Sequence, residues 1–296
     1  MTESPERFRA ASEEARETGA VVGFVPTMGA LHRGHSRLLQ QAAEECAFVA
    51  LSIFVNPLQF DSPADLEVYP RELEHDLAVA RSAKCHLVFT PTEATMYPGG
   101  PPEVTVDPGR LGGRLEGRSR AGHFRGVLTV LAKLLHLAGP CRVYFGEKDA
   151  QQLALVRRMV SDLELPASVV ACPTVRDPDG LALSSRNGRL SADERKAAPV
   201  LFEALSDAAV VVRKGERRGD VLRAEMDRRI GGEPLARLDY VAVVEEASWE
   251  DVVEITGPAR ALAAAWLGET RLIDNLVLPW TASGTVHNTN EERGGV

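Results

Sequence analysis

The sequence lacks both of the common glycine-rich phosphate-binding motifs. Neither Gly-x-Gly-x-x-Gly nor Gly-x-x-x-x-Gly-Lys-Ser/Thr occurs among its 296 residues. The first motif marks the turn of dinucleotide-binding domains, and the second marks the P-loop of many nucleotide-binding enzymes. A nucleotide site in this chain would therefore have to use a different strand-to-helix turn.

Three further absences narrow the class of protein. The four cysteines form no Cys-x-x-Cys pair and fall in or beside apolar runs, so we expect reduced, buried thiols. The net charge of −8 and the pI near 5.5 argue against a nucleic-acid or membrane-surface binder. No apolar run approaches the ~18 residues of a membrane helix, and the polar stretch Met1 to Arg16 has no signal-peptide core. These observations favour a cytoplasmic protein.

Strand and helix patterns alternate through residues 1–175. Strands are predicted at Val21–Val25, Phe48–Phe54, His86–Phe89, Arg142–Phe145 and Ser168–Ala171, and helices at Ser36–Cys46, Leu73–Ala83, Val127–Leu137 and Ala150–Leu163. Before the first strand, Glu13–Thr18 is predicted to be the end of a short polar helix. This alternation predicts an α/β fold, with a Rossmann-like parallel sheet and helices on both of its faces. Ligands of such sheets bind where strands end and turns begin.

The pattern changes after residue 175. Residues 176–279 begin with a polar loop, continue with helices at Ala192–Val212 and Asp220–Ile230, and end with strands at Leu238–Val244, Ala261–Leu267 and Thr270–Leu278. We expect a smaller C-terminal α+β domain that acts as a lid. The polar, glycine-rich residues 280–296 are predicted to be a disordered tail.

The stretch Pro26–His35, which reads Pro-Thr-Met-Gly-Ala-Leu-His-Arg-Gly-His, carries the strongest functional signal. It joins an apolar strand pattern to an amphipathic helix pattern, and Gly29 and Gly34 allow a ligand to approach the backbone closely. The start of a helix presents unpaired N–H groups and a positive dipole end, which suit an anion. Because His32 and His35 lie one turn apart there, we interpret the stretch as a site for nucleotide phosphates.

Two other interpretations of these histidines remain open from the residues alone. A histidine at a helix start is often a cap or an ordinary surface residue. His-x-x-His also occurs in metal sites, but no carboxylate or cysteine stands at helical spacing beside this pair.

Polar residues also follow the later strands. The amides of Asn56 and Gln59 can donate and accept, which suits a substrate with hydroxyls and a carboxylate, although Asn-Pro after a strand is also common turn chemistry. In Gly146–Asp149, the lysine can neutralise phosphate and the aspartate can hold Mg²⁺ through water. Ser184–Arg186 combines two hydroxyls with a guanidinium, which suits a pyrophosphate group.

Together these stretches resemble one family. His-x-Gly-His is the signature of the nucleotidylyltransferase superfamily, and the preceding Pro-Thr-Met makes the stretch similar to that of the pantothenate synthetase family. Phe-Val-Asn-Pro-x-Gln-Phe, Phe-Gly-Glu-Lys-Asp, Ser-Ser-Arg-Asn and Thr-Arg-Leu-Ile-Asp-Asn match it in order, over about residues 20–278. The resemblance implies a homodimeric ligase that joins (R)-pantoate to β-alanine with ATP and Mg²⁺. The reaction would pass through pantoyl adenylate and release pyrophosphate and AMP.

The resemblance also implies a role for each matching residue. Catalysis, by stabilising charge on the phosphates, would fall to His35, His32 and Lys148. ATP would contact Met28, Gly29, Ala30, Leu31, His32, Arg33, Gly34, His35, Gly146, Glu147, Lys148, Asp149, Val175, Leu183, Ser184, Ser185 and Arg186. Pantoate or β-alanine would contact Gln59, Gln152, Asn56, Tyr69 and His123, and Mg²⁺ would be bound by Asp76 and Asp149 together with the phosphates.

Four positions depart from the usual residues of the family. His75 stands in place of an acid, Ala121 of a proline, Ala150 of an aromatic residue and Leu183 of a methionine. These changes bear on packing and affinity more than on reaction type. Two rival functions stay open: a nucleotidylyltransferase that leaves the nucleotide on its product, and a nucleotide-binding protein without turnover.

Overall fold

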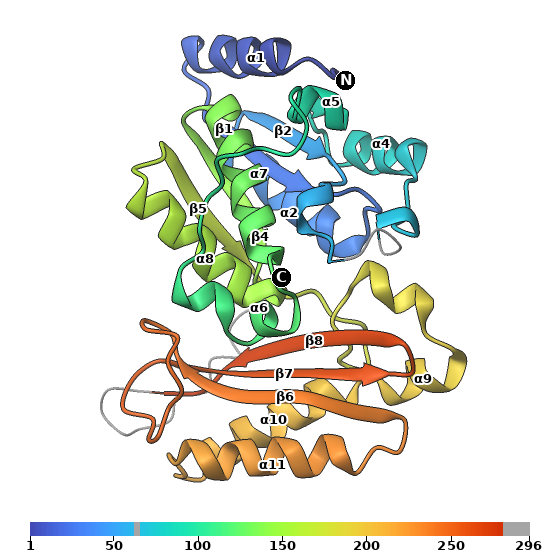
Figure 1. Cartoon of the computed structure of the whole chain (residues 1–296), viewed down its shortest axis with the longest axis vertical. Coiled ribbons are helices and arrows are strands. Elements are labelled where there is room, and N and C mark those ends of the chain that lie inside the picture. The colour runs from blue at the N-terminus through green and yellow to red at the C-terminus, as the bar shows by residue number, and fades with distance from the viewer. Residues whose placement is uncertain (62–65, 281–296) are drawn as a thin grey trace. The chain divides into compact units, whose positions relative to one another are not determined.

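A five-stranded parallel sheet organises the first of the two units into which the chain divides, Met1–Val175 (Figure 1). The computed structural model describes residues 1–61 and 66–280. The strands are β1 (Val22–Thr27), β2 (Phe48–Ile53), β3 (Leu87–Phe89), β4 (Cys141–Gly146) and β5 (Ala167–Cys172), and they lie in the order β3-β2-β1-β4-β5. Strands β2 and β3 are added on one side of β1, and β4 and β5 on the other. The direction in which strands are added therefore reverses between β1 and β4. The prediction of a parallel sheet flanked by helices is confirmed.

Helices cover both faces of this sheet. One face packs against α1 (Pro5–Glu17), α5 (Glu93–Met96), α7 (His123–Ala138) and α8 (Ala150–Asp162), and the other against α2 (Arg33–Glu45) and α4 (Leu73–Ser82). Successive residues of a strand point to opposite faces. Phe24 accordingly joins the first core, where its ring lies 5.6 Å from that of Phe8, and Val25 joins the second.

Strand β1, which contains Pro26 near its C-terminal end, pairs over different lengths with its two neighbours. Toward β2, pairing runs the whole length of the strand, from Val22 to Thr27, whereas toward β4 it covers Gly23 and Phe24. Proline has no N–H to donate to a ladder. The C-terminal ends of β1 and β4 are therefore not tied by ladder hydrogen bonds where their two turns begin.

Several helix boundaries differ from the predicted ones, for local reasons. The first helix begins at Pro5 because Ser4 caps it by accepting from the N–H of Arg7, and it ends at Glu17, within the stretch Glu13–Thr18 predicted to be its end. The helix predicted from Val127 begins at His123, after Gly122 in a left-handed conformation. The helical pattern Ala192–Val212 is divided by Pro199 into α9 (Ala192–Ala197) and α10 (Val200–Arg213). The glycine-rich segment between α5 and α7 contains the short 3₁₀ helix η2 (Arg110–Gly113) and the short helix α6 (Glu116–Ser119).

The second unit begins at Arg176 and has a core of its own. Its antiparallel sheet has the strands β6 (Ala236–Glu245), β7 (Ala259–Leu267) and β8 (Thr270–Val277), in that order. Helices α10 and α11 (Gly219–Gly231) pack on this sheet (Figure 1). The predicted disordered tail, 280–296, lies from residue 281 onward outside the described residues.

All four cysteines are free thiols, as expected. Cys46, Cys141 and Cys172 are buried, whereas Cys85 is half-buried. Within the residues that the structure describes, no helix is both long enough and apolar enough to cross a membrane.

Candidate active site

Three turns that carry predicted site residues follow three neighbouring strands. Residues 28–35 follow β1, the 3₁₀ helix η1 (Pro57–Gln59) follows β2, and the 3₁₀ helix η3 (Glu147–Asp149) follows β4. Parallel strands end at the same edge of their sheet, and ligands favour the point where the strand order reverses. The fold therefore gathers these three turns at the edge where a site is expected.

The turn after β1 is held by a carboxylate from α4. Both oxygens of Asp76 accept backbone hydrogen bonds, Oδ2 from Ala30 N at 3.0 Å and Oδ1 from Leu31 N at 2.7 Å. Asp76 is 1% exposed, and a Cβ added at Gly29 would stand 2.7 Å from its Oδ2. The magnesium role predicted for Asp76 is not supported by this geometry, because its oxygens already serve the turn.

His75, one of the departures from the family's usual residues, also serves this turn. Its Nε2 lies 3.1 Å from the carbonyl oxygen of Leu31. A carbonyl oxygen only accepts, so Nε2 donates, which an acidic side chain ionised at neutral pH could not do. Two successive residues of α4 thus hold both backbone groups of Leu31.

His32 and His35 form a reciprocal cap at the start of α2. Nδ1 of His32 accepts from Gly34 N at 3.1 Å, and Nδ1 of His35 accepts from His32 N at 3.2 Å. A backbone N–H can only donate, so neither Nδ1 carries a proton, and in the neutral ring the proton is on Nε2. The ring centroids lie 4.1 Å apart. The predicted pattern of unpaired N–H groups needs correction here: the imidazoles cap the helix themselves and leave their Nε2–H groups for a ligand.

Both imidazoles are neutral at pH 7. Burial lowers the pKa of His35 to about 3, and the neighbouring His32 ring is the next cause. Burial also lowers the pKa of His32, followed by the Lys148 ammonium. The influence of Lys148 on both rings agrees with the neighbouring positions of β1 and β4.

Asn56 and Gln59, both predicted to contact substrate, are in contact with one another. The amide Nδ2 of Asn56 donates to Gln59 Oε1 at 3.0 Å and to the carbonyl oxygen of Gly126 at 3.1 Å. Its Oδ1 accepts from the Tyr97 hydroxyl at 2.8 Å and from Leu58 N at 3.4 Å. Asn56 is 1% exposed and its amide is fully engaged, so it serves to position Gln59. Gln59 differs, because its Nε2 donates to a weak acceptor, the Met28 sulfur, at 3.0 Å.

His123 joins the start of α7 to η1. Its Nδ1 lies 2.8 Å from the carbonyl oxygen of Gln59 and must donate to it, so Nε2 is the acceptor for Arg120 Nη1 at 3.0 Å. Both ring nitrogens therefore have protein partners, which favours a supporting role for His123 at η1 over the substrate contact predicted for it. A Cβ at Gly126 would lie 2.1 Å from the Leu58 carbonyl oxygen, so glycine is required for this close approach.

The remaining predicted residues of the first unit lie around these turns. Gln152 is half-buried on α8, and the ring of Tyr69 meets that of Phe60 edge-on with centroids 5.6 Å apart. Lys148 Nζ lies 3.7 Å from Asp149 Oδ1. Among residues 1–61 and 66–280, no group of three or more His, Cys, Asp and Glu side chains is arranged to hold a metal ion.

Comparison with known proteins identifies the family. A family model described as Pantoate-beta-alanine ligase matches residues 1–277. The chain is 50% identical over 286 residues to a pantothenate synthetase of Rubrobacter xylanophilus, covering 94% of this chain and 98% of the relative. The chain belongs to the pantoate–β-alanine ligase family.

Two solved structures of this ligase family support the assignment. A pantothenate synthetase from Thermus thermophilus matches with a TM-score of 0.86 and 45% identity, over 93% of this chain and 98% of that chain. A pantoate–β-alanine ligase from Francisella tularensis, complexed with beta-gamma ATP and β-alanine, matches with a TM-score of 0.75 and 33% identity, over 93% and 96% of the two chains.

The other predicted ligase residues belong to the loop of the second unit, apart from Val175, which ends the first. Leu183, Ser184 and Arg186 are half-buried and Ser185 is exposed. The Ser184 hydroxyl accepts from Arg186 N at 3.2 Å and begins the 3₁₀ helix η4 (Ser185–Arg189).

One supporting residue was missed by the sequence reasoning. Gln151 is 2% exposed, donates to the carbonyl oxygens of Leu111 and Arg114 at 2.8 Å each, and accepts from Glu116 N at 3.0 Å. It thereby holds the segment from η2 to the start of α6 against α8. An amide beside Gln152 was the available signal, since a buried amide requires partners.

We predict that stability falls as the pH is lowered, because His123 is buried in its neutral form. Burial, with the Arg120 guanidinium as the next cause, lowers the pKa of His123 to about 4, whereas an unfolded histidine titrates near ~6.5. Between these values the unfolded state binds more protons, so the free energy of unfolding is lost as pH falls, by about 1.4 kcal/mol per pH unit for this residue.

Urea unfolding of the wild type and of His123→Gln between pH 8 and 4 tests this prediction. The variant should show a shallower dependence on pH below about 6.5. His136→Gln is the matched control, because His136 is exposed on the same helix, and it should keep the wild-type dependence. The same slope in the wild type and in His123→Gln would contradict the prediction.

Proposed function

We propose that this chain joins pantoate to β-alanine at the expense of ATP, through a pantoyl adenylate. Family membership supports ATP-dependent ligation. The observation that carries the assignment of the site is the pair of imidazoles whose Nδ1 atoms accept backbone N–H groups. Two neutral Nε2–H donors at the start of α2, with the Lys148 ammonium nearby, suit the phosphates of a nucleotide.

In the first step, a carboxylate oxygen of pantoate attacks the α-phosphorus of ATP. A new O–P bond forms as the bond to the bridging oxygen breaks, and pyrophosphate leaves. The carboxylate is already ionised near pH 7, so no side chain has to act as a base. The residues have to position the reactants and stabilise negative charge, which is the role we assign to His32, His35 and Lys148.

The pantoate pocket is proposed to centre on Gln59, with Gln152 as a second contact. Asn56 fixes the side-chain oxygen of Gln59, and the Met28 sulfur is a weak acceptor for its Nε2. A hydroxyl or carboxylate oxygen of pantoate would be a better acceptor. Asn56 and His123 support this pocket through the contacts between η1 and α7.

In the second step, the amine of β-alanine attacks the acyl carbon of pantoyl adenylate. The C–N bond forms, the C–O bond to AMP breaks, and the amine loses a proton to solvent. The described residues around the three turns need only hold the two substrates in this orientation.

Magnesium is proposed to enter with the phosphates of ATP. Asp149, whose side chain is 51% exposed beside Lys148, is the carboxylate that would reach the ion, directly or through water. Mg²⁺ needs only one or two protein carboxylates, because it usually keeps several waters and binds substrate phosphates. When bound, the ion would neutralise phosphate charge.

The function is tested by measuring pyrophosphate release from ATP with Mg²⁺ and pantoate, with and without β-alanine. Release that requires pantoate, with sustained formation of free AMP and pantothenate only when β-alanine is added, is the expected result. A stable nucleotide conjugate as the product would indicate a nucleotidylyltransferase. ATP binding without release would indicate a protein without this turnover.

We predict that His35→Ala lowers kcat by ~10²–10³, as expected on loss of one charge-stabilising donor. The protein should still fold, with the free energy of unfolding lowered by about 1 kcal/mol because the His32 N–H loses its acceptor. His35→Asn serves as a comparison, because its amide oxygen can still accept from the His32 N–H while the Nε2–H donor is lost, so its kcat should also fall. Near-normal turnover in His35→Ala would remove His35 from catalysis.

We also predict that Asp76→Asn lowers kcat by ~10-fold to 10²-fold, because the turn carrying the histidines moves. The amide would present a donor to one of the two N–H groups that the carboxylate now accepts. Glu74→Gln is the matched control, since it removes an exposed carboxylate from the same turn of α4. Equal rates in the two variants would refute the positioning role.

A homodimer in the cytoplasm, and a lid role for the second unit, are proposed on family resemblance. Light scattering at micromolar protein should give a mass twice the 32.0 kDa of the chain. A mass of one chain under these conditions would refute the dimer.

A further inference from the structure

Arg176 ties together the loop and the sheet of the second unit through hydrogen bonds to Gly180 in the loop and to Asp274 and Asn275 on β8. Its Nη1 and Nη2 donate to Oδ2 and Oδ1 of Asp274 on β8, at 2.5 and 2.9 Å. The same guanidinium donates to the carbonyl oxygens of Gly180 at 3.0 Å and Asn275 at 3.3 Å. Its central carbon lies 4.1 Å from the centroid of the Phe202 ring.

This ion pair is more deeply buried than the surface ion pairs of the molecule, and its geometry is fixed by more hydrogen bonds. The side chain of Asp274 is 3% exposed and that of Arg176 is 17% exposed. Oδ1 of Asp274 also accepts from Asn275 N at 2.7 Å. A bidentate guanidinium–carboxylate pair fixes orientation as well as distance, and removal of one partner leaves a buried charge without compensation.

The anchored part of the loop is a tight turn. Gly180 has φ of +94°, its N–H donates to the Asp177 carbonyl oxygen at 2.9 Å, and the N–H of Asp177 donates to the Leu181 carbonyl oxygen at 2.9 Å. A Cβ at Gly180 would lie 2.3 Å from Phe202 Cδ1. The turn therefore packs closely on the same aromatic ring that the guanidinium covers.

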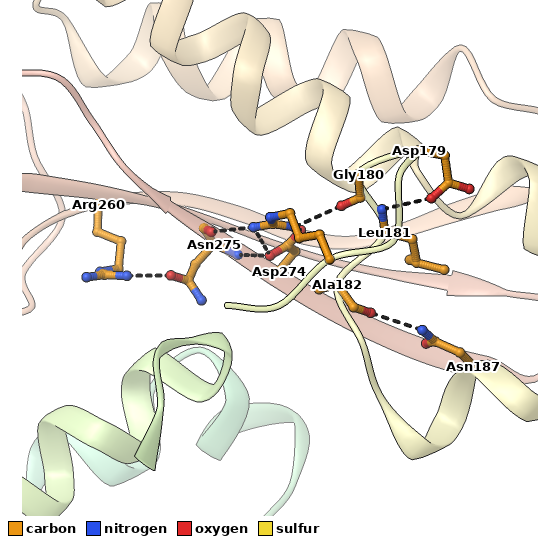
Figure 2. Close-up of polar contacts among 9 residues, drawn as sticks. Asp179, Gly180, Leu181, Ala182, Asn187, Arg260, Asp274 and Asn275 are labelled. Atoms are coloured by element: carbon orange, nitrogen blue, oxygen red, sulfur yellow. Dashed lines mark hydrogen bonds and ion pairs between the residues drawn. The ribbon is translucent and has the colours of Figure 1, made fainter. Parts of the chain in front are cut away.

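The anchored turn continues directly into Ser184–Arg186, the segment proposed to hold nucleotide phosphates. Ala182 pairs with Arg176 in an antiparallel bridge, and its carbonyl oxygen accepts from Asn187 Nδ2 at 3.0 Å (Figure 2). Ala182 and Asn187, which flank Leu183–Arg186, are thus joined to each other by a hydrogen bond. Ala182 also joins them to Arg176 through the bridge.

We propose that the Arg176–Asp274 pair positions Ser184–Arg186 for the phosphates of ATP. The pair acts as a positioning element and does not itself touch the substrate. This inference rests on the proposed function. It also gives a role to the Thr-Arg-Leu-Ile-Asp-Asn stretch: its aspartate supplies the counter-charge that fixes the phosphate loop.

The test is the steady-state kinetics of Arg176→Lys with ATP and pantoate varied separately, together with ATP binding by calorimetry. Lysine keeps the charge but loses the bidentate geometry. The expected result is a rise of about tenfold in KM and Kd for ATP, with KM for pantoate within twofold of wild type. Arg229→Lys is the matched control, because Arg229 pairs with Glu203 on the exposed surface of the same unit, and it should change neither constant.

A purely structural role would give a different result. Arg176→Lys would then lose thermal stability and active fraction, while the folded enzyme kept wild-type constants for ATP, and this outcome overturns the proposal. If Arg176→Lys does not fold, Asp274→Asn is measured instead, because it removes the charge of the pair and one of the two oxygens that accept from Arg176. An unchanged Kd for ATP in Asp274→Asn likewise overturns it. Wild-type protein that binds ATP but does not activate pantoate would reject the proposed function, while calorimetry would still report on the pair.

Discussion

Backbone N–H groups that lie between the end of β1 and the first full turn of α2 need acceptors, and side chains supply them. Asp76 accepts from Ala30 and Leu31, and the two imidazoles accept from His32 and Gly34. An unpaired buried N–H costs about as much as a lost hydrogen bond. The close approach of α4, the orientation of both rings and the position of the turn all follow from this requirement.

Side chains around the neighbouring turn, η1, also differ in how far the protein occupies their hydrogen-bonding groups. The polar groups of Asn56 and His123 are hydrogen-bonded within the protein, and these bonds hold η1 against α7. Gln59 keeps one donor on a weak acceptor, the sulfur of Met28. Asn56 and His123, whose polar groups all have protein partners, thus hold Gln59, which can exchange its weak partner for a better acceptor. This arrangement is expected where a substrate binds.

Local patterns in the sequence predicted the strands of the parallel sheet and the place of the histidine turn. At Phe48–Phe54 and at Pro26–His35, the conformation is determined by the local residues: an apolar run in the first stretch and glycines in the second. Boundaries set by one residue, such as the cap at Ser4 or the break at Pro199, were placed less well.

Roles that depend on distant partners could not be predicted from the sequence. Asp76 meets Leu31 from 45 positions away, and Arg176 meets Asp274 from 98 positions away. Nothing in the spacing of either pair indicates contact, because the fold brings them together. The sequence therefore pointed to Asp76 as an acid near the site, whereas its use as a backbone acceptor required the structure.

The orientation of the two imidazoles has a consequence for selectivity. With each Nδ1 committed to the backbone, the rings offer an incoming group hydrogen atoms and no lone pair. Fully ionised phosphate oxygens match such a surface completely. A hydroxyl, or a phosphate that kept its proton, would be left with a hydrogen that these rings cannot accept, and burying it there would be unfavourable. In the phosphate-binding role proposed for it, the pair would therefore discriminate by the protonation state of the ligand as well as by its charge.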